Sequence, residues 1–192
     1  MEKNLKRHNA LVVNARNCRL CAPFLPHEPN PIFNTAPSAK ILIVGQAPGL
    51  KAHQRDTAFD DPSGDRLRDW MSISKETFYT PHLVSVMPMA FCFPGYKNGA
   101  DAPPRKECAP AWHKQFLSFL QPKVTLYVGR YAQQYYLPQF RTLTEAVQKP
   151  SESHFVLPHP SGRNNRWLAK NPWFELDILP ALKRTIVSVL SV

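Results

Sequence analysis

The chain has 192 residues, of which 43% are hydrophobic and 11% aromatic, enough to form a folded core and to exclude wholesale disorder. Its 24 Lys and Arg against 14 Asp and Glu give a net charge of +10, which favours a polyanionic partner such as nucleic acid. No run approaches the roughly 18 apolar residues of a membrane span, and the N-terminal sequence lacks a signal-peptide core. We therefore expect one cytoplasmic domain over residues 1–192, with four reduced cysteines that are free thiols or metal ligands.

Apolar periodicity predicts helices that alternate with buried strands. Residues 5–15 have the spacing of an amphipathic helix, and the proline-rich passage 23–37 that follows is typical of an extended loop. Continuous apolar runs predict three strands and a weaker fourth, at Ile41–Val44, Val124–Val128, 155–157 and 82–86. Helical patterns occupy 65–74, 107–120, 130–137 and 179–189. This order predicts an α/β sandwich around a short parallel sheet.

In such sheets ligands bind beyond the carboxyl ends of the strands, so the segments that follow the strands are expected to carry the chemistry. The first strand runs into Gly45-Gln46-Ala47-Pro48-Gly49, a rigid turn whose backbone N–H groups could approach a phosphate or a flat ring. A plain strand-exit turn is the alternative. The turn matches neither the dinucleotide-binding glycine pattern nor a P-loop.

A polar loop downstream combines an aromatic ring with two carboxylates, as Phe59-Asp60-Asp61. The ring could stack on a base, and a carboxylate could stabilise a cation-like transition state. The plainer alternative is a solvated Asp pair that caps the helix expected to begin near Asp65.

The last predicted strand is followed by a basic loop in which His159 stands between two prolines. Those prolines restrict where the imidazole can point, which favours a functional histidine over a structural one. Side chains of the types that contact phosphates follow within a few residues: Ser161, Arg163, Asn164 and Arg166.

The turn at 45–49 and the sequence His159-Pro160-Ser161 together resemble the two motifs of the uracil-DNA glycosylase superfamily. The cysteines, Cys18-x2-Cys21 followed by Cys92 and Cys108, resemble the thiolate set of its iron–sulfur branches, families 4 and 5. The likeness runs over residues 17–180. It implies a three-layer α/β/α fold with a four-stranded parallel sheet. It also implies a monomeric, monofunctional hydrolase that removes uracil or a related deaminated base from single- or double-stranded DNA in base-excision repair.

The resemblance also implies roles for individual residues. A nucleotide must be flipped out of the stack before the enzyme can reach it, and Phe59 would then stack on the base. His159 would donate a hydrogen bond to the departing base, and Ser161 with Arg163 or Asn164 would pinch the DNA backbone. The implied base-binding residues are Gly45, Gln46, Ala47 and Phe59; the implied DNA-binding residues are Pro48, Gly49, Ser161, Arg163, Asn164 and Arg166.

Two departures from the family pattern bear on the chemistry. The first motif carries no carboxylate at Gln46 or Ala47. One iron–sulfur branch also lacks it there and has an Asp in the loop after the Phe instead, so the resemblance assigns the acid to Asp61, with Asp60 as the alternative, in a loop about one residue shorter than that branch's. The catalytic set is then Asp61, His159 and Gln46. Residues 84–89 contain no Asn to pair with the uracil edge, so base discrimination is expected to be looser.

Four thiolates can hold a [4Fe–4S] cluster or a tetrahedral zinc ion. Only the first cysteine pair is closely spaced, which favours the cluster; structural zinc and four unrelated free cysteines remain the alternatives. A cluster would pin the N-terminal helix and the 87–108 segment to the sheet.

A rival hypothesis keeps the fold without the catalysis. The missing acid in the first motif and the missing Asn are also consistent with a lesion-binding protein that is weakly active or inactive. A metal-dependent hydrolase is poorly supported, because His159 has no spaced His or Glu partner.

Overall fold

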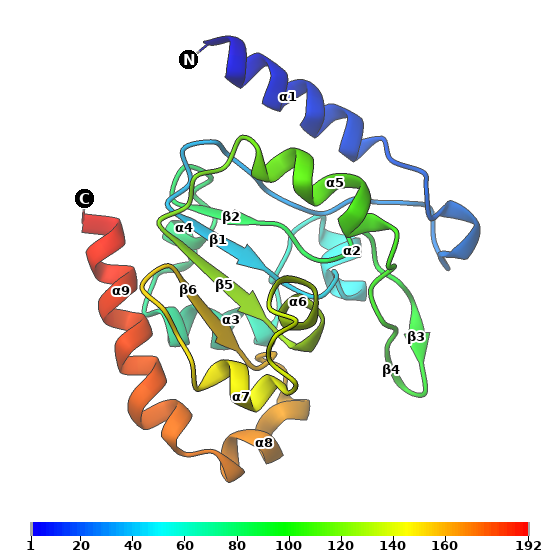
Figure 1. Ribbon diagram of the computed structural model, residues 1–192. Coiled ribbons are helices and arrows are strands. Elements are labelled where there is room, and N and C mark those ends of the chain that lie inside the picture. Colours follow the sequence, from blue (N-terminus) through cyan, green and yellow to red (C-terminus); the bar gives the residue numbers. More distant parts are fainter. Residues whose placement is uncertain (1, 192) are drawn as a thin grey trace.

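A computed structural model describes residues 2–191. At its centre lies a four-stranded parallel sheet in the order β2-β1-β5-β6 (Figure 1). Ile41 of β1 pairs with Val84 of β2 on one side and with Val124 of β5 on the other. The strands are β1 (Ile41–Val44), β2 (Val84–Val86), β5 (Val124–Val128) and β6 (His154–Leu157). The predicted parallel sheet and its four strands are confirmed.

Nine α-helices are assigned within residues 2–191. The long ones follow the predicted apolar stripes, whereas four short helices were not predicted because they are too short to show a 3.6-residue period. Their bounds are α1 (Glu2–Arg16), α2 (Leu50–Arg55), α3 (Pro62–Met71), α4 (Lys75–Phe78), α5 (Cys108–Leu117), α6 (Arg130–Tyr136), α7 (Leu143–Val147), α8 (Asn165–Lys170) and α9 (Leu179–Ser191). None of them is long and apolar enough to cross a membrane.

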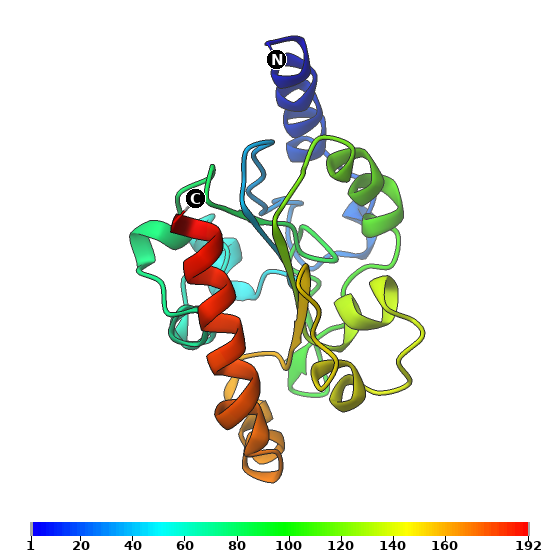
Figure 2. The ribbon, with the colours of Figure 1, turned by 60° about the vertical axis from the view of Figure 1, so that its left-hand side comes forward.

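The sheet is covered on both faces, which explains why its strands are apolar throughout (Figure 2). Alternate residues of β1 point to opposite faces: Ile41 and Ile43 pack in one core with α3 and α9, and Leu42 and Val44 in a second core with α1, α5 and α6. The expected three-layer α/β/α architecture is therefore confirmed.

Helix α3 begins earlier than predicted, at Pro62 rather than near Asp65. The side chain of Asp61 accepts the backbone N–H of Gly64 at 2.8 Å, and this N-cap fixes the start of the helix. Pro62 takes the first helical position, where a missing N–H costs nothing. The predicted range 65–74 therefore leaves out the first turn of the helix, whose start is set by the cap at Asp61.

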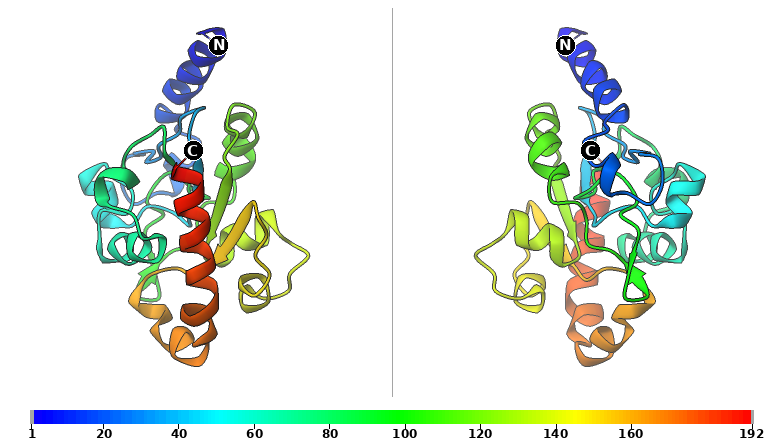
Figure 3. Two further views of the ribbon diagram at one scale, coloured as in Figure 1. Left: turned by 90° about the vertical axis from the view of Figure 1, so that its left-hand side faces the viewer. Right: turned by 90° about the vertical axis from the view of Figure 1, so that its right-hand side faces the viewer.

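A short β-hairpin that was not predicted stands at the carboxyl edge of the sheet. It is formed by β3 (Tyr96–Lys97) and β4 (Ala100–Asp101) and lies away from α9, which is behind the sheet in the right-hand view of Figure 3. The guanidinium of Arg163, from the loop after β6, donates to the carbonyl of Gly99 at 2.7 Å. The hairpin is therefore fastened to the loop that carries His159.

Candidate active site

The segments that follow β1 and β6 converge on one crevice with a volume of about 70 Å³. The loop before α3 and the β3–β4 hairpin complete its walls. The residues that line it and bear on the chemistry are Gly45, Gln46, Ala47, Pro48, Gly49, Phe59, Asp61, Asp101 and His159. Residues more than 100 positions apart in the sequence thus meet at the carboxyl edge of the sheet, where ligands of parallel sheets bind.

The turn after β1 is held by the chain that leaves β2. The carbonyl of Gly45 accepts the N–H of Met89 at 2.9 Å, and the carbonyl of Gln46 accepts the N–H of Ala90 at 3.1 Å. The N–H groups of Gln46 and Ala47 have no acceptor within residues 2–191. Unpaired donors at the wall of a crevice can bind the polar edge of a ligand.

Phe59 occupies the left-handed region, with φ of 57°, where an aromatic residue is a genuine outlier. Its ring packs so closely on the backbone of Gly45 that a Cβ atom there would lie 3.3 Å from Cζ. The edge-on ring of Phe78, 6.0 Å away between centroids, supports it from behind. Such strain persists only where the surroundings enforce it, and it marks sites of function.

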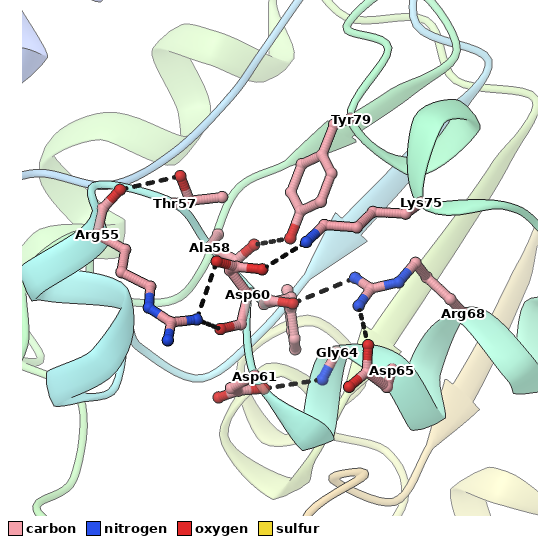
Figure 4. Close-up of polar contacts among 11 residues, drawn as sticks. Arg55, Thr57, Ala58, Asp60, Asp61, Gly64, Asp65, Arg68, Lys75 and Tyr79 are labelled. Atoms are coloured by element: carbon pink, nitrogen blue, oxygen red, sulfur yellow. Dashed lines mark hydrogen bonds and ion pairs between the residues drawn. The ribbon is translucent and has the colours of Figure 1, made fainter.

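Gly64 and Arg68 enforce the position of Phe59. A Cβ at residue 64 would lie 1.8 Å from the carbonyl oxygen of Phe59, so only glycine fits. The buried guanidinium of Arg68 donates to that same carbonyl at 3.2 Å and to Asp65 at 2.6 Å (Figure 4). Helix α3 therefore fixes the backbone that presents the aromatic ring.

The two adjacent carboxylates have different surroundings, as Figure 4 shows. Asp60 forms ion pairs with Lys75 at 2.8 Å and Arg55 at 3.1 Å, and the hydrogen bond from Lys75 is the main cause of its lowered pKa. Asp61 lines the crevice; one of its oxygens caps α3, and the other has no partner within residues 2–191. The structure thus places Asp61, and not Asp60, at the crevice, and the capping alternative holds for Asp61 as well.

His159 is held as a neutral donor. The backbone N–H of Ser161 donates to its Nδ1 atom at 3.3 Å, which leaves the ring proton on Nε2. Burial lowers the pKa of His159, and the nearby carboxylates of Asp61 and Asp101 only partly oppose this. At neutral pH the imidazole is therefore uncharged, with an N–H available on Nε2.

Two of the predicted DNA-contacting side chains have partners inside the protein. Arg163 donates to the hairpin, and the amide of Asn164 donates to the carbonyl of His159 at 2.7 Å. Both therefore hold the His159 loop in place. The side chains of Ser161 and Arg166 have no hydrogen-bond partner within residues 2–191.

Asp101 is a crevice residue that the sequence reasoning missed. It reaches the crevice from β4, and its carboxylate lies 3.6 Å from where a Cβ on Gly49 would stand. The segment around it has no apolar alternation, so the hairpin gave no signal; the only hint was a turn-forming Asn98-Gly99 pair.

The four cysteines also converge, on a second cavity that we call the thiol cavity. Cys18 and Cys21 reach it from the segment after α1, Cys92 from the segment after β2, and Cys108 from the start of α5. None of the four forms a disulfide. Burial raises the pKa of Cys92 to about 11 and that of Cys108 to about 12, so both are neutral thiols unless a cation displaces their protons.

The wall of the thiol cavity carries N–H donors beside the cysteines. Two buried N–H donors in its wall, Arg105 Nε and Trp112 Nε1, have no partner among the described residues 2–191, and the N–H of Phe91 donates to Cys108 Sγ at 3.4 Å. Such donors suit the sulfur atoms of a cluster. Within residues 2–191, no three His, Cys, Asp or Glu side chains are grouped closely enough to hold a single metal ion as they stand.

Comparison with known proteins shows the family of this chain. The family model of the uracil DNA glycosylase superfamily matches residues 32–183, a span that includes every crevice residue. The chain is also similar to a candidate uracil DNA glycosylase from Methanosarcina acetivorans, known from a solution NMR structure. The two share 15% identity over 80% of this chain and 97% of the other, with a TM-score of 0.49.

Proposed function

Because this chain belongs to the uracil DNA glycosylase superfamily, we propose that it hydrolyses the N-glycosidic bond of uracil or a related deaminated base in DNA. One observation carries the proposal: a strained aromatic ring, an unpaired carboxylate oxygen and a neutral histidine surround a single crevice. We further propose that it acts as a monomeric, monofunctional repair enzyme in the cytoplasm.

The crevice would receive a nucleotide that has been flipped out of the DNA. Extrusion costs a few kcal/mol of stacking and pairing, and the ring of Phe59 would return part of it by stacking on the base. The free N–H groups of Gln46 and Ala47 would donate to the carbonyl oxygens of that base. Pro48 and Gly49 in the same turn would contact the adjoining DNA backbone.

The reaction would divide between the two sides of the crevice. As the bond from sugar to base breaks, its electron pair moves onto the base, and Nε2–H of His159 donates a hydrogen bond to that developing negative charge. The free oxygen of Asp61 would stabilise the oxocarbenium-like sugar and orient a water molecule. The water oxygen then bonds to the sugar carbon, and one water proton passes to the carboxylate.

The chain gives little basis for strict selection of uracil. Ser85, the one polar side chain of β2, already accepts the N–H of Ala36 at 3.0 Å, and the crevice wall beside it consists of Val86 and Pro88. Without a side-chain amide, discrimination depends on the backbone donors of the first turn, which recognise a carbonyl rather than one particular base. Hypoxanthine and xanthine are therefore substrates to test beside uracil.

We also propose that Cys18, Cys21, Cys92 and Cys108 hold a [4Fe–4S] cluster. Its chemistry would be structural: it would cross-link the segment after α1 to the chain between β2 and α5. Hydrolysis at the crevice needs no electron transfer, and the thiol cavity does not share its lining residues with the crevice. Purified protein that is brown and contains iron supports this assignment, whereas colourless protein with stoichiometric zinc contradicts it.

An excision panel tests the proposed activity. Purified protein is incubated with single- and double-stranded oligonucleotides that contain uracil, hypoxanthine or xanthine, and abasic sites are cleaved with alkali. Release of at least one base supports the proposal. Tight, salt-sensitive binding of these DNAs with no release over hours would instead support the rival, a lesion-binding protein on the same fold.

A further inference from the structure

An open groove of about 710 Å³ lies on the other side of the hairpin from the crevice. We call it the hairpin groove. Its chemically distinctive lining residues are Phe24, Lys97, Arg105, Lys106, Tyr131 and Tyr135. None of these residues lines the crevice.

The groove and the crevice share a wall. Asp101 lines the crevice and the next residue, Ala102, lines the groove; likewise Pro88 faces the crevice and Met89 the groove. Arg163 holds the tip of the hairpin against the His159 loop at the same edge. A DNA strand that leaves the crevice across β3 and β4 therefore enters the groove.

The groove presents positive charge that the protein itself does not neutralise. Lys97 and Lys106 are exposed and have no ion-pair or hydrogen-bond partner within residues 2–191. Arg105 is paired with Glu107 at 2.8 Å but also lies over the ring of Phe24, 4.4 Å from its centroid. Lysines without partners, on a chain of net charge +10, complement a polyanion.

Exposed aromatic rings stand beside these charges. Phe24 is 61% exposed and Tyr135 is 46% exposed, and Tyr96, 62% exposed, stands on the hairpin itself. These three are all of the aromatic residues among the large hydrophobic side chains exposed in residues 2–191; the other five are aliphatic. Rings left in solvent beside unpaired lysines are the combination that binds single-stranded nucleic acid, by stacking on bases and attracting phosphates.

We propose that the hairpin groove binds the single-stranded DNA that adjoins the flipped nucleotide. Bases in a duplex are stacked on both faces and cannot lie on these rings, so the groove selects unpaired nucleotides. The inference rests on the proposed function for the path of the DNA strand, which would run from the nucleotide in the crevice into the groove. Binding of single-stranded DNA in the groove does not itself require that a base be excised. The protein should then favour damaged bases in single-stranded or frayed DNA over those in intact duplex.

Fluorescence anisotropy with a labelled oligonucleotide that contains no damaged base tests the groove. The double variant Lys97→Glu with Lys106→Glu is compared with Lys183→Glu with Arg184→Glu, which changes the charge equally on α9, on the opposite side of the molecule (Figure 1). The groove variant is expected to weaken single-strand binding at least tenfold more than the α9 variant. The variant Tyr135→Leu, which keeps an apolar side chain against Tyr136, should weaken it about tenfold.

Each outcome decides the inference. Preferential loss of single-strand affinity in the groove variants, with circular dichroism unchanged, supports it. Equal losses in the groove and α9 variants, or equal losses for single-stranded and duplex DNA, overturn it. If the wild type excises no base but loses single-strand binding in the groove variants, the proposed function fails while the groove assignment stands.

Discussion

The crevice and the thiol cavity both gather residues from distant parts of the chain, but they hold them in opposite ways. In the crevice, Asp61 and His159 each form one side-chain hydrogen bond and keep one polar side-chain atom without a partner within residues 2–191. The thiol cavity is lined by four cysteines and by two buried N–H donors that have no partner within residues 2–191. This contrast is the basis for proposing that the crevice acts on a ligand and that the thiol cavity joins segments of the protein.

If this contrast is correct, substitutions in the crevice should lower the rate of base excision with little loss of stability. Substitutions in the thiol cavity should lower the stability of the fold with little loss of the excision rate per folded molecule. The two regions can therefore be separated by measuring single-turnover excision and thermal unfolding for the same set of variants.

The largest expected effect is the loss of the acid. Asp61→Asn should lower the single-turnover rate about thousandfold, because an amide cannot stabilise a cationic sugar or take a proton from water. Asn is also a good N-cap, so the unfolding temperature should change little. Asp60→Asn is the matched control, since Asp60 points to Lys75 and Arg55; it should leave the rate nearly unchanged. If Asp60→Asn is the more damaging variant, Asp61 is not the acid.

Removal of the histidine should have the next largest effect. His159→Ala should lower the rate about 100-fold, the usual result of losing one donor to a developing negative charge. Burial lowers the pKa of His159 below its ordinary 6.5, so the neutral, active form persists into mildly acidic solution. The wild-type rate should therefore begin to fall only below pH 6.5. A rate that rises as the pH falls would mean that the charged imidazole is the active form.

The thiol cavity should respond in stability. Cys108→Ser removes one of four proposed ligands at a buried position and should lower the unfolding temperature by about 10 °C, with loss of the visible absorption of the cluster. Excision per folded molecule, measured well below that temperature, should fall much less than in the crevice variants. Unchanged stability and no iron in the wild type would show that the four cysteines are ordinary thiols.

The smallest effect is expected at Asp101. Its carboxylate raises the pKa of His159, so Asp101→Asn should move the acidic limb of the rate profile to lower pH. The rate at neutral pH should stay within about threefold of wild type, because Asp101 is exposed and solvent screens its charge. A loss comparable to that of Asp61→Asn would instead make Asp101 a catalytic residue.

The parts of the site that the sequence could predict are those with a local signal. The segments after β1 and β6 each follow an apolar strand, and parallel strands place their carboxyl ends at one edge, so Gln46 and His159 were expected to meet. The sequence could not show which of Asp60 and Asp61 faces the crevice, because two adjacent Asp residues share the same sequence context but have different neighbours in the folded protein. Only the cap on Gly64 and the ion pairs with Arg55 and Lys75 distinguish them.

Other features depend on contacts that no local pattern encodes. Asp101 reaches the crevice because Arg163, more than 60 residues later, holds the hairpin tip. The same contact explains why Arg163, predicted to touch DNA, has a partner within the protein. Long-range hydrogen bonds of this kind are set by the folded shape and not by spacing along the chain.

The close contact between Gly64 and the carbonyl of Phe59 means that any active variant of this chain should keep glycine at position 64. Even the single methyl group of alanine would collide with the backbone of Phe59, although Gly64 does not line the crevice. Laboratory evolution toward new bases should therefore leave this position untouched while the crevice walls change. A random library selected for excision would reveal it as the least tolerant site outside the reacting groups.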